Sequence, residues 1–494
     1  MNAFRLRLKQ PPAGLLKPLL VALPFIALIV SAVVGFDRLK MVLLMVAPLM
    51  AAIFLNVELG IYVMLGFSTV LIFIKRMMPN LDANQIGLAL EGMLVLMGMR
   101  LGVDLVRERG WSAFKTPITL PLLAFVGYQV VEVFNPFAPS LKFGLYGLRD
   151  TLRVLGVFLV LYYFRSQAKI KRLSFFWLGL LLFESLYGIF QHHHGILNQE
   201  YLWLLDSGSW RTHILNGYIR VFGTVGDAAT FGFLMITGTL MLYGLALSSR
   251  GWKLWALLGL SAPMLYAMIL SYSRGPIVAV VAGLGAMLIV SRNWKLAIGS
   301  VLIGSLVIGG LAAAGNTKLI DRVMTATKPS EDESFQVRMG YINTFLPRIV
   351  ERPFGSGLWT SGASGLAVTG GQAIPGTTIG IPTDNNYFKW GLEMGYVGIA
   401  FFAWFMLTLQ LSLIRSYARL KEPYLKATAL GLFGVFTCYL VGALSNDIFV
   451  QKPLSEWLYI AAGLGVLLSQ SRSAVPPTVT RSLPPAEGAR GRRP

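Results

Sequence analysis

Apolar stretches long enough to cross a membrane recur along almost all of the 494-residue chain, from Leu19 to Leu468. Each covers about 17–25 residues, which lets a helix span about 30 Å of hydrocarbon. Strands that cross a membrane would instead appear as shorter segments of alternating polarity. Only 13% of the residues are charged, whereas a soluble protein carries about a quarter. The chain is therefore predicted to be an all-α, polytopic integral membrane protein.

We expect about 14 transmembrane helices and one large extramembrane loop. The helices are predicted at residues 18–35, 40–55, 58–74, 86–105, 117–134, 149–164, 173–190, 226–248, 252–270, 275–291, 295–314, 385–411, 425–445 and 453–470. No small-residue cleavage site follows the first stretch, so we interpret it as a retained helix rather than a signal peptide. The pattern divides the chain into helices 1–11 at 1–314, the large loop at 315–383, helices 12–14 at 384–470 and a tail at 471–494.

The net charge of +20 lies mostly in short loops between the apolar stretches. One alternating set of loops, with both tails, holds about 24 Lys and Arg, and the other set with its rims holds about 11. Positively charged loops stay in the cytoplasm. Both termini are therefore predicted on the cytoplasmic side of a bacterial inner membrane, and loop 315–383 on the periplasmic side. The Pro- and Arg-rich tail is predicted to be disordered. No basic run is interleaved with aromatic residues, so nucleic-acid binding is not expected.

The predicted periplasmic loop has two parts. Ser330 and Glu333 resemble a capping box, and apolar residues at helical spacing follow between 342 and 349. They predict an amphipathic helix on the membrane rim that ends at Pro353. The Gly-, Ser- and Thr-rich segment 354–383 comes next. It is predicted to be mobile, either as a lid over a substrate or as a solvated connector.

Several arginines are predicted at the periplasmic ends of helices, where the topology rule disfavours positive charge. Arg149 and Arg153 are four residues apart and share one helical face. Arg220 and Arg274 lie in Gly-rich turns beside spans, and Arg338 lies in the predicted amphipathic helix. Snorkelling to lipid headgroups is the alternative role for each. Fixed guanidinium groups at a membrane face suit phosphate or pyrophosphate on a lipid head.

Other chemistries find little support in the sequence. The neighbouring residues His192–His194 cannot all face one ion, and no Cys or carboxylate set completes a metal site. The single cysteine, Cys438, lies in an apolar stretch and makes no intrachain disulfide. Rossmann and P-loop signatures are absent. We therefore expect neither a metal nor another cofactor, and His213 stays open as a general base.

Four segments together resemble the O-antigen polymerase and O-antigen ligase superfamily of bacterial polysaccharide assembly. They are Arg220 in R-x-x-G-T, Arg274 in S-R-G, VRMGYINTFLPRIVERPFGSG at 337–357 and DNNYFKWGLEMGYVG at 384–398. Each segment is degenerate alone, whereas their order, spacing and predicted side of the membrane make the set fairly specific. The resemblance runs through residues 145–400.

This resemblance implies a membrane glycosyltransferase that polymerises undecaprenyl-pyrophosphate-linked repeat units at the periplasmic face into O-antigen or exopolysaccharide. The glycan moves from a lipid-linked donor to a sugar hydroxyl on a lipid-linked acceptor, with inversion and without a metal. The leaving pyrophosphate needs cationic stabilisation, which assigns Arg220 and Arg274 to catalysis. The implied partners are donor, acceptor and bilayer, with a chain-length regulator and a flippase as further candidates.

One position departs from the family's ligases, which usually carry His-Asn or His-Ser where this chain has Asp384-Asn385. That histidine is their proposed base, so its absence favours a polymerase over a ligase. We predict that Asp384 is the base here, with helix N-capping as its alternative role. The remaining residues predicted to bind pyrophosphate or glycan are Arg149, Arg153, Arg338, Asn385 and Tyr272.

Other functions stay open at this point. Within the superfamily they are an O-antigen ligase and a protein O-oligosaccharyltransferase. A secondary transporter is the main rival from another class, and Glu184 and Glu393 are intramembrane acids that it could use. Glu393, however, is about half a turn out of phase with Asp384, so we expect it to pack between helices. A purely structural role for the protein is the third alternative, and it would not explain the arginines at the predicted periplasmic ends of helices.

Overall fold

The computed structural model describes residues 48–78, 83–215, 217–313 and 333–471. In this part of the chain regular structure is almost entirely helical, and each strand has two residues. Seven helices are long and apolar enough to cross a membrane. They are α3 (Val57–Met77), α8 (Gln167–His194), α11 (Ala228–Leu247), α12 (Trp252–Leu270), α13 (Arg274–Ser291), α18 (Asn386–Arg419) and α19 (Pro423–Gly442). The predicted class, an all-helical multi-pass membrane protein, is confirmed at this level.

The other described elements are shorter, more polar or lie between these helices. They are α4 (Ala83–Glu108), η1 (Gly110–Phe114), α5 (Thr119–Glu132), α6 (Leu141–Thr151), η2 (Leu152–Val154), α7 (Leu155–Tyr163), α9 (Asn198–Asp206), α10 (Trp210–His213), β1 (Ile214–Leu215), β2 (Tyr218–Ile219), α14 (Trp294–Ala313), α16 (Glu333–Glu351), α17 (Gly362–Thr369), β3 (Thr378–Ile379) and α20 (Leu454–Gln470). Five of the predicted spans coincide largely with α4, α5, α7, α14 and α20. The total of about 14 spans stays a prediction.

Some predictions fall outside the described residues. They concern the first predicted span, half of the second, the capping residue Ser330 and the tail beyond Ser471.

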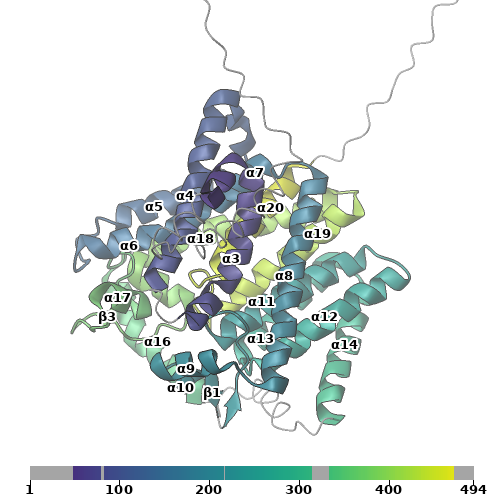
Figure 1. The fold of residues 1–494 in the computed structure, drawn as a ribbon. Helices are drawn as coiled ribbons and strands as arrows, with labels where there is room; N and C mark the ends of the chain where they lie inside the picture. Colours follow the sequence, from purple (N-terminus) through teal and green to yellow (C-terminus); the bar gives the residue numbers. More distant parts are fainter. Residues whose placement is uncertain (1–47, 79–82, 216, 314–332, 472–494) are drawn as a thin grey trace, which may run out of the picture.

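Helix α11 forms the centre of the bundle (Figure 1). It packs against α8, α12, α13 and α19, and 94% of its most apolar window is buried. A helix that is apolar all round belongs in such a position. A second group, α5, α7, α18 and α20, packs beside it. There the rings of Trp390 and Phe402 lie 4.4 Å apart and Phe402 lies 4.8 Å from Phe449, which joins α18 to the segment before α20.

Two stretches between the long helices gather at the lower side of the molecule in Figure 1. One contains α9, α10 and the antiparallel pair β1–β2, in which Ile214 lies opposite Ile219. The other contains α16, α17 and β3. Helix α16 confirms the predicted helix and ends at Glu351, with Phe345 and Ile349 buried against α18.

The Gly-rich segment differs from its prediction, because it is folded. It forms α17 and β3, and backbone bridges pair Ser361 with Thr378 and Gly362 with Ile379. Composition predicted mobility, but Ser361 is fully buried and its hydroxyl donates to Glu393 of α18. The many small residues let the chain pack closely on α18.

Candidate functional site

Arg220 follows the β1–β2 pair and lies against the turn between α12 and α13. Its Nε donates to the carbonyl oxygen of Ser271 at 3.1 Å, and its Nη1 donates to that of Thr212 at 2.9 Å. The rings of Tyr218 and Tyr272 stack with centroids 6.2 Å apart across the same boundary. The two segments that carry the principal predicted arginines are therefore neighbours in space.

Arg274 begins α13 immediately after this turn. Tyr272 has φ 52°, an uncommon conformation for a residue with a bulky side chain, and its hydroxyl is buried without a hydrogen-bond partner among the described residues. A β-carbon at Gly275 would lie 2.6 Å from Oγ of Ser445. A larger residue at this glycine would displace the Ser445 side chain, because α13 begins in close contact with the loop between α19 and α20.

This loop, residues 443–453, also supports the segment that contains Asp384 and Asn385. Nδ2 of Asn385 donates to the carbonyl oxygen of Leu444 at 3.2 Å. Oγ1 of Thr383 donates to Oδ2 of Asp447 at 2.9 Å. The 443–453 loop therefore contacts both the start of α13 and the start of α18, which brings two of the four motif segments together.

The capping role considered for Asp384 is wrong, because the N-cap of α18 is Asn385. Oδ1 of Asn385 accepts hydrogen bonds from the backbone N–H groups of Tyr387 at 2.9 Å and Phe388 at 3.1 Å. Asn385 has the extended backbone of an N-cap, with φ −160°. Asp384 is exposed and left-handed, with φ 41°. Its carboxylate is therefore not used as the cap.

Arg149 and Arg153 approach the 443–453 loop from α6 and η2, and both are paired with carboxylates. Nη2 of Arg149 lies 2.8 Å from Oε2 of Glu91, and Nζ of Lys452 lies 3.2 Å from the other oxygen of that carboxylate. Arg149 is one-fifth exposed. It can thus still face a ligand while sharing Glu91 with Lys452.

Arg153 is more deeply enclosed. Its guanidinium lies 2.7 Å from Asp150 and 3.1 Å from Glu456, and it donates to the carbonyl oxygen of Val450 at 2.9 Å. Only 4% of the side chain is exposed. These contacts favour a structural role for Arg153. The predicted site residue Arg338 lies on α16, and its side chain is outside what the structure describes.

Buried polar residues anchor the R-x-x-G-T motif, and sequence analysis did not single out most of them. Nη1 of Arg76 donates to the carbonyl oxygen of Gly223 at 2.9 Å and pairs with Glu200 at 3.2 Å. The backbone N–H of Thr224 donates to Glu184 at 3.1 Å, and its hydroxyl also bonds that carboxylate. Glu184 therefore fixes a loop, which weakens the transporter hypothesis.

The second acid of that hypothesis, Glu393, is also held within the protein. It pairs with Nζ of Lys389 at 2.7 Å and accepts a hydrogen bond from Oγ of Ser361 at 2.6 Å. Two residues further along the chain, Gly395 has φ 63°, and a β-carbon at this position would lie 1.9 Å from the carbonyl oxygen of Pro353. Glu393 packs between elements as predicted, and the RPFGSG and EMGYVG motifs contact each other.

Burial shifts the pKa of two titratable groups near the site. The His213 ring lies edge-on to Phe222 with centroids 4.9 Å apart, and its burial lowers the pKa of the imidazole. Burial raises the pKa of Asp447, and the charge of Lys389 opposes that shift. Because only 3% of His213 is exposed, the ring is poorly placed to accept a proton from a sugar hydroxyl.

The histidine run at the end of α8 does not form a cluster. His193 lies within hydrogen-bond distance of the Tyr266 hydroxyl, at 3.1 Å, while His194 stacks on Phe190. Within the described ranges, no three His, Cys, Asp or Glu side chains are grouped as metal ligands would be.

Sequence analysis missed the 443–453 loop as a member of the site. Besides the contacts above, Oε1 of Gln451 accepts a hydrogen bond from Thr230 at 2.7 Å, next to the cap Asp227 of α11. One signal was present in the sequence. Lys452 is a further positive residue on the predicted periplasmic side, within a polar run between two apolar stretches.

Comparison with known proteins agrees with these motifs. Residues 259–403, from α12 into α18, match the profile of the family described as O-antigen ligase. The chain is also 26% identical over 222 residues to an O-antigen polymerase from Salmonella muenchen, an alignment that covers 44% of this chain and 50% of the relative. The chain thus spans about half the length of the relative it matches. The resemblance seen in the sequence is confirmed: this membrane protein is similar to members of the O-antigen polymerase and O-antigen ligase superfamily.

Proposed function

We propose that the chain polymerises undecaprenyl-pyrophosphate-linked oligosaccharide repeat units at the periplasmic face of the inner membrane. One observation carries the proposal. Three motif segments far apart in the sequence form a connected set, in which Arg220 bonds to Ser271, Gly275 contacts Ser445, and Asn385 bonds to Leu444. These segments carry Arg220, Arg274 and the exposed Asp384, and guanidinium groups with a carboxylate are the chemistry that the reaction needs.

In the proposed step, a hydroxyl oxygen of the acceptor sugar attacks the anomeric carbon of the donor glycan. The bond from that carbon to the pyrophosphate oxygen breaks as the new glycosidic bond forms on the opposite face, so the configuration inverts. Arg220 and Arg274 stabilise the negative charge that develops on the leaving pyrophosphate. Asp384 accepts the proton of the attacking hydroxyl. Tyr272 and Asn385 lie beside these groups and would contact the glycan.

The orientation in this proposal rests on loop charge, and exposed tryptophans support an interfacial position for the basic loops. Trp111, Trp252 and Trp294 are 60%, 75% and 80% exposed. All three lie in the basic loops that are predicted to face the cytoplasm. Tryptophan gathers at membrane–water interfaces, and lysine and arginine gather on the cytoplasmic side. We therefore place these loops at the cytoplasmic interface and the proposed active site at the opposite one.

The description of the matched family supports a second candidate, an O-antigen ligase. Asp384 in place of the ligases' usual histidine favours polymerase. Gel analysis of surface polysaccharide from a deletion strain separates the two. Unpolymerised single repeat units on the surface would identify a polymerase, whereas polymer missing only from its final acceptor would identify a ligase. A chain-length regulator and a flippase are the proposed membrane partners of the polymerase.

A further inference from the structure

A hollow of about 230 Å³ lies apart from the contacts of the 443–453 loop. It is enclosed by the last turns of α16, the folded Gly-rich segment and the connection between α5 and α6. Residues that line it include Arg348, Glu351, Arg352, Phe137, Thr360 and Thr377. None of these residues has a role in the proposed transfer step.

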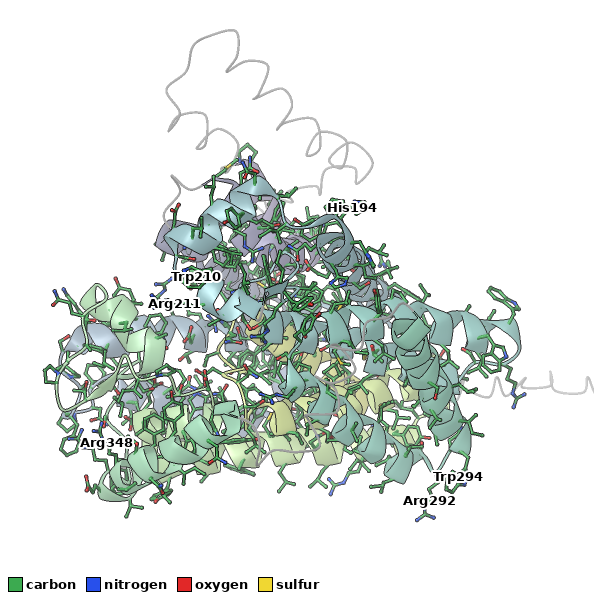
Figure 2. All side chains as sticks on the ribbon, turned by 90° about the horizontal axis from the view of Figure 1, so that it is seen from below. His194, Trp210, Arg211, Arg292, Trp294 and Arg348 are labelled. Carbon is green, nitrogen blue, oxygen red and sulfur yellow. The ribbon has the colours of Figure 1, made fainter. Side chains whose placement is uncertain are left out.

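The polar wall of this hollow comes from α16, which has an apolar face packed against α18 and a separate charged face. Phe345 and Ile349 are buried against α18. Arg348, Glu351 and Arg352 have spacings of three and four residues, so they share another face of the same helix. Figure 2 shows Arg348 near the end of the molecule formed by the green elements of the large loop. The face that α16 leaves for the hollow is therefore charged.

The hydrogen bonds within the wall leave it rich in acceptors. The hydroxyls of Thr360 and Thr377 donate to backbone carbonyl oxygens at 2.6 and 2.7 Å. A hydroxyl oxygen has two lone pairs, and that of Thr377 accepts one bond from the backbone N–H of Ile379, so both oxygens can still accept from a ligand. Arg352 donates one N–H to Oγ of Ser356 at 3.0 Å, and a guanidinium has five N–H groups in all. The wall thus offers both donors and acceptors to hydroxyl groups.

Apolar surface completes the lining. Ile379 and Leu392, which are 2% and 5% exposed, also line the hollow. Phe137 is 58% exposed, and the Arg352 guanidinium lies 4.9 Å from its ring centroid. A few placed polar groups over apolar surface are typical of a small-molecule site. A sugar ring matches this lining, because it carries hydroxyls around its edge and C–H groups on its faces.

We propose that this hollow binds one sugar residue of the lipid-linked glycan, away from the bond that is formed. The proposal rests on the proposed polymerase function. A free phosphate fits less well, since Glu351 would repel it. An acyl chain would give no hydrogen bond to the remaining N–H groups of the guanidiniums. Leu392 follows Asn385 by seven residues on α18, or about 10 Å along the helix axis. The occupant is therefore a sugar of the glycan chain rather than the reacting one.

Binding can be measured without any reaction, using saturation-transfer difference NMR on the detergent-purified full chain. The probe is the repeat-unit oligosaccharide released by mild acid from lipid-linked single repeat units of a strain that lacks this chain. We expect binding to the natural chain. It should weaken on the order of 10-fold in Arg348→Gln, which removes charge-assisted hydrogen bonds. Thr377→Trp should weaken it at least as much by filling the hollow. Arg250→Gln, at an exposed site elsewhere, should leave it unchanged.

The same variants have a separate signature in cells. Arg348→Gln and Thr377→Trp should still link repeat units but give a shorter chain-length distribution, while Arg220→Ala should give no polymer and still bind the free oligosaccharide. A natural chain that does not bind the probe, or binding that neither hollow variant weakens, contradicts the sugar site and leaves the transfer site intact. If instead Arg220→Ala polymerises normally, the proposed active site is wrong while the binding result stands. Equal amounts of membrane-inserted protein are required in every comparison.

Discussion

Oδ1 of Asn385 accepts a hydrogen bond from the backbone N–H of Tyr387, 2.9 Å away, and this bond begins α18. Because Asn385 provides the cap, the preceding Asp384 is not needed for it. The two neighbours therefore have separable roles, and each can be tested alone.

Asp384→Asn should leave a stable, membrane-inserted protein with very little polymer. The change keeps the size of the side chain and suits a backbone with positive φ, but it removes the proton acceptor. Loss of a general base typically lowers a rate by 10²–10⁴-fold. Polymer formation in purified membranes measures the effect. Asn385→Ala tests the cap separately by stability alone, because loss of a cap costs about 1 kcal/mol and should lower the thermal midpoint, which Asp384→Asn should leave unchanged. Near-normal polymerisation by Asp384→Asn would mean that Asp384 is not the base.

Arg153→Met should destabilise the protein strongly. Arg153 is buried between Asp150 and Glu456, and removing it leaves two carboxylates without their cation. Breaking a buried ion pair typically costs 3–5 kcal/mol. We expect a large fall in the apparent Tm in detergent. The triple change Arg153→Met, Asp150→Asn, Glu456→Gln should recover much of that loss. A single variant as stable as the natural chain would instead mean that the three groups are not mutually dependent.

His213 should make stability fall at acidic pH. Burial lowers the folded-state pKa of this histidine, so the folded protein binds fewer protons than the unfolded chain between that value and the ordinary pKa of about 6.5. The free energy of unfolding then decreases as pH drops below about 6.5, by up to about 1.4 kcal/mol per pH unit. His213→Asn keeps a donor near Nδ1 but does not titrate, so its Tm should change less between pH 7 and 5. His194→Asn, at an exposed position of α8, should follow the natural chain; identical slopes for all three would exclude His213 as the cause.

Topology can be mapped with reporter fusions. A reporter placed at Gly362 should indicate the periplasm, and one placed near Pro476 should indicate the cytoplasm. The reason is that positive charge is concentrated in the set of loops on the same side as the two tails. If both report the same compartment, the proposed orientation is wrong, and the placement of the active site fails with it.

The sequence predicted the helical membrane class and the segments of the site, but not how the site is held. Arg220 and Arg274 were singled out because an arginine on the predicted periplasmic side of the membrane needs a local reason. Arg149 and Arg153, which share one helical face, appeared in the sequence to be as suitable for binding pyrophosphate as Arg220 and Arg274. Their carboxylate partners Glu91 and Glu456 come from distant parts of the chain, which no local pattern reveals.

The Gly-rich segment shows a second limit. Its composition is typical of mobile chain, yet Ser361 bonds to Glu393 and the backbone packs against α18. Small residues permit close packing as well as mobility, and only the partner surface decides between them. The 443–453 loop was missed for a related reason, since its role comes from contacts with four different helices.

The central claim is tested most directly with purified protein in liposomes and lipid-linked single repeat units extracted from a strain that lacks this chain. The account predicts a ladder of longer glycans on the lipid carrier, with release of undecaprenyl pyrophosphate and no requirement for a metal ion. Arg220→Ala and Arg274→Ala should give no ladder, and the Lys variants only a partial one, because lysine lacks the planar fork that grips pyrophosphate. A natural chain that forms no ladder yet transfers preformed polymer to lipid A-core would contradict the polymerase account. Ala variants that polymerise normally would contradict the proposed role of Arg220 and Arg274 in the active site.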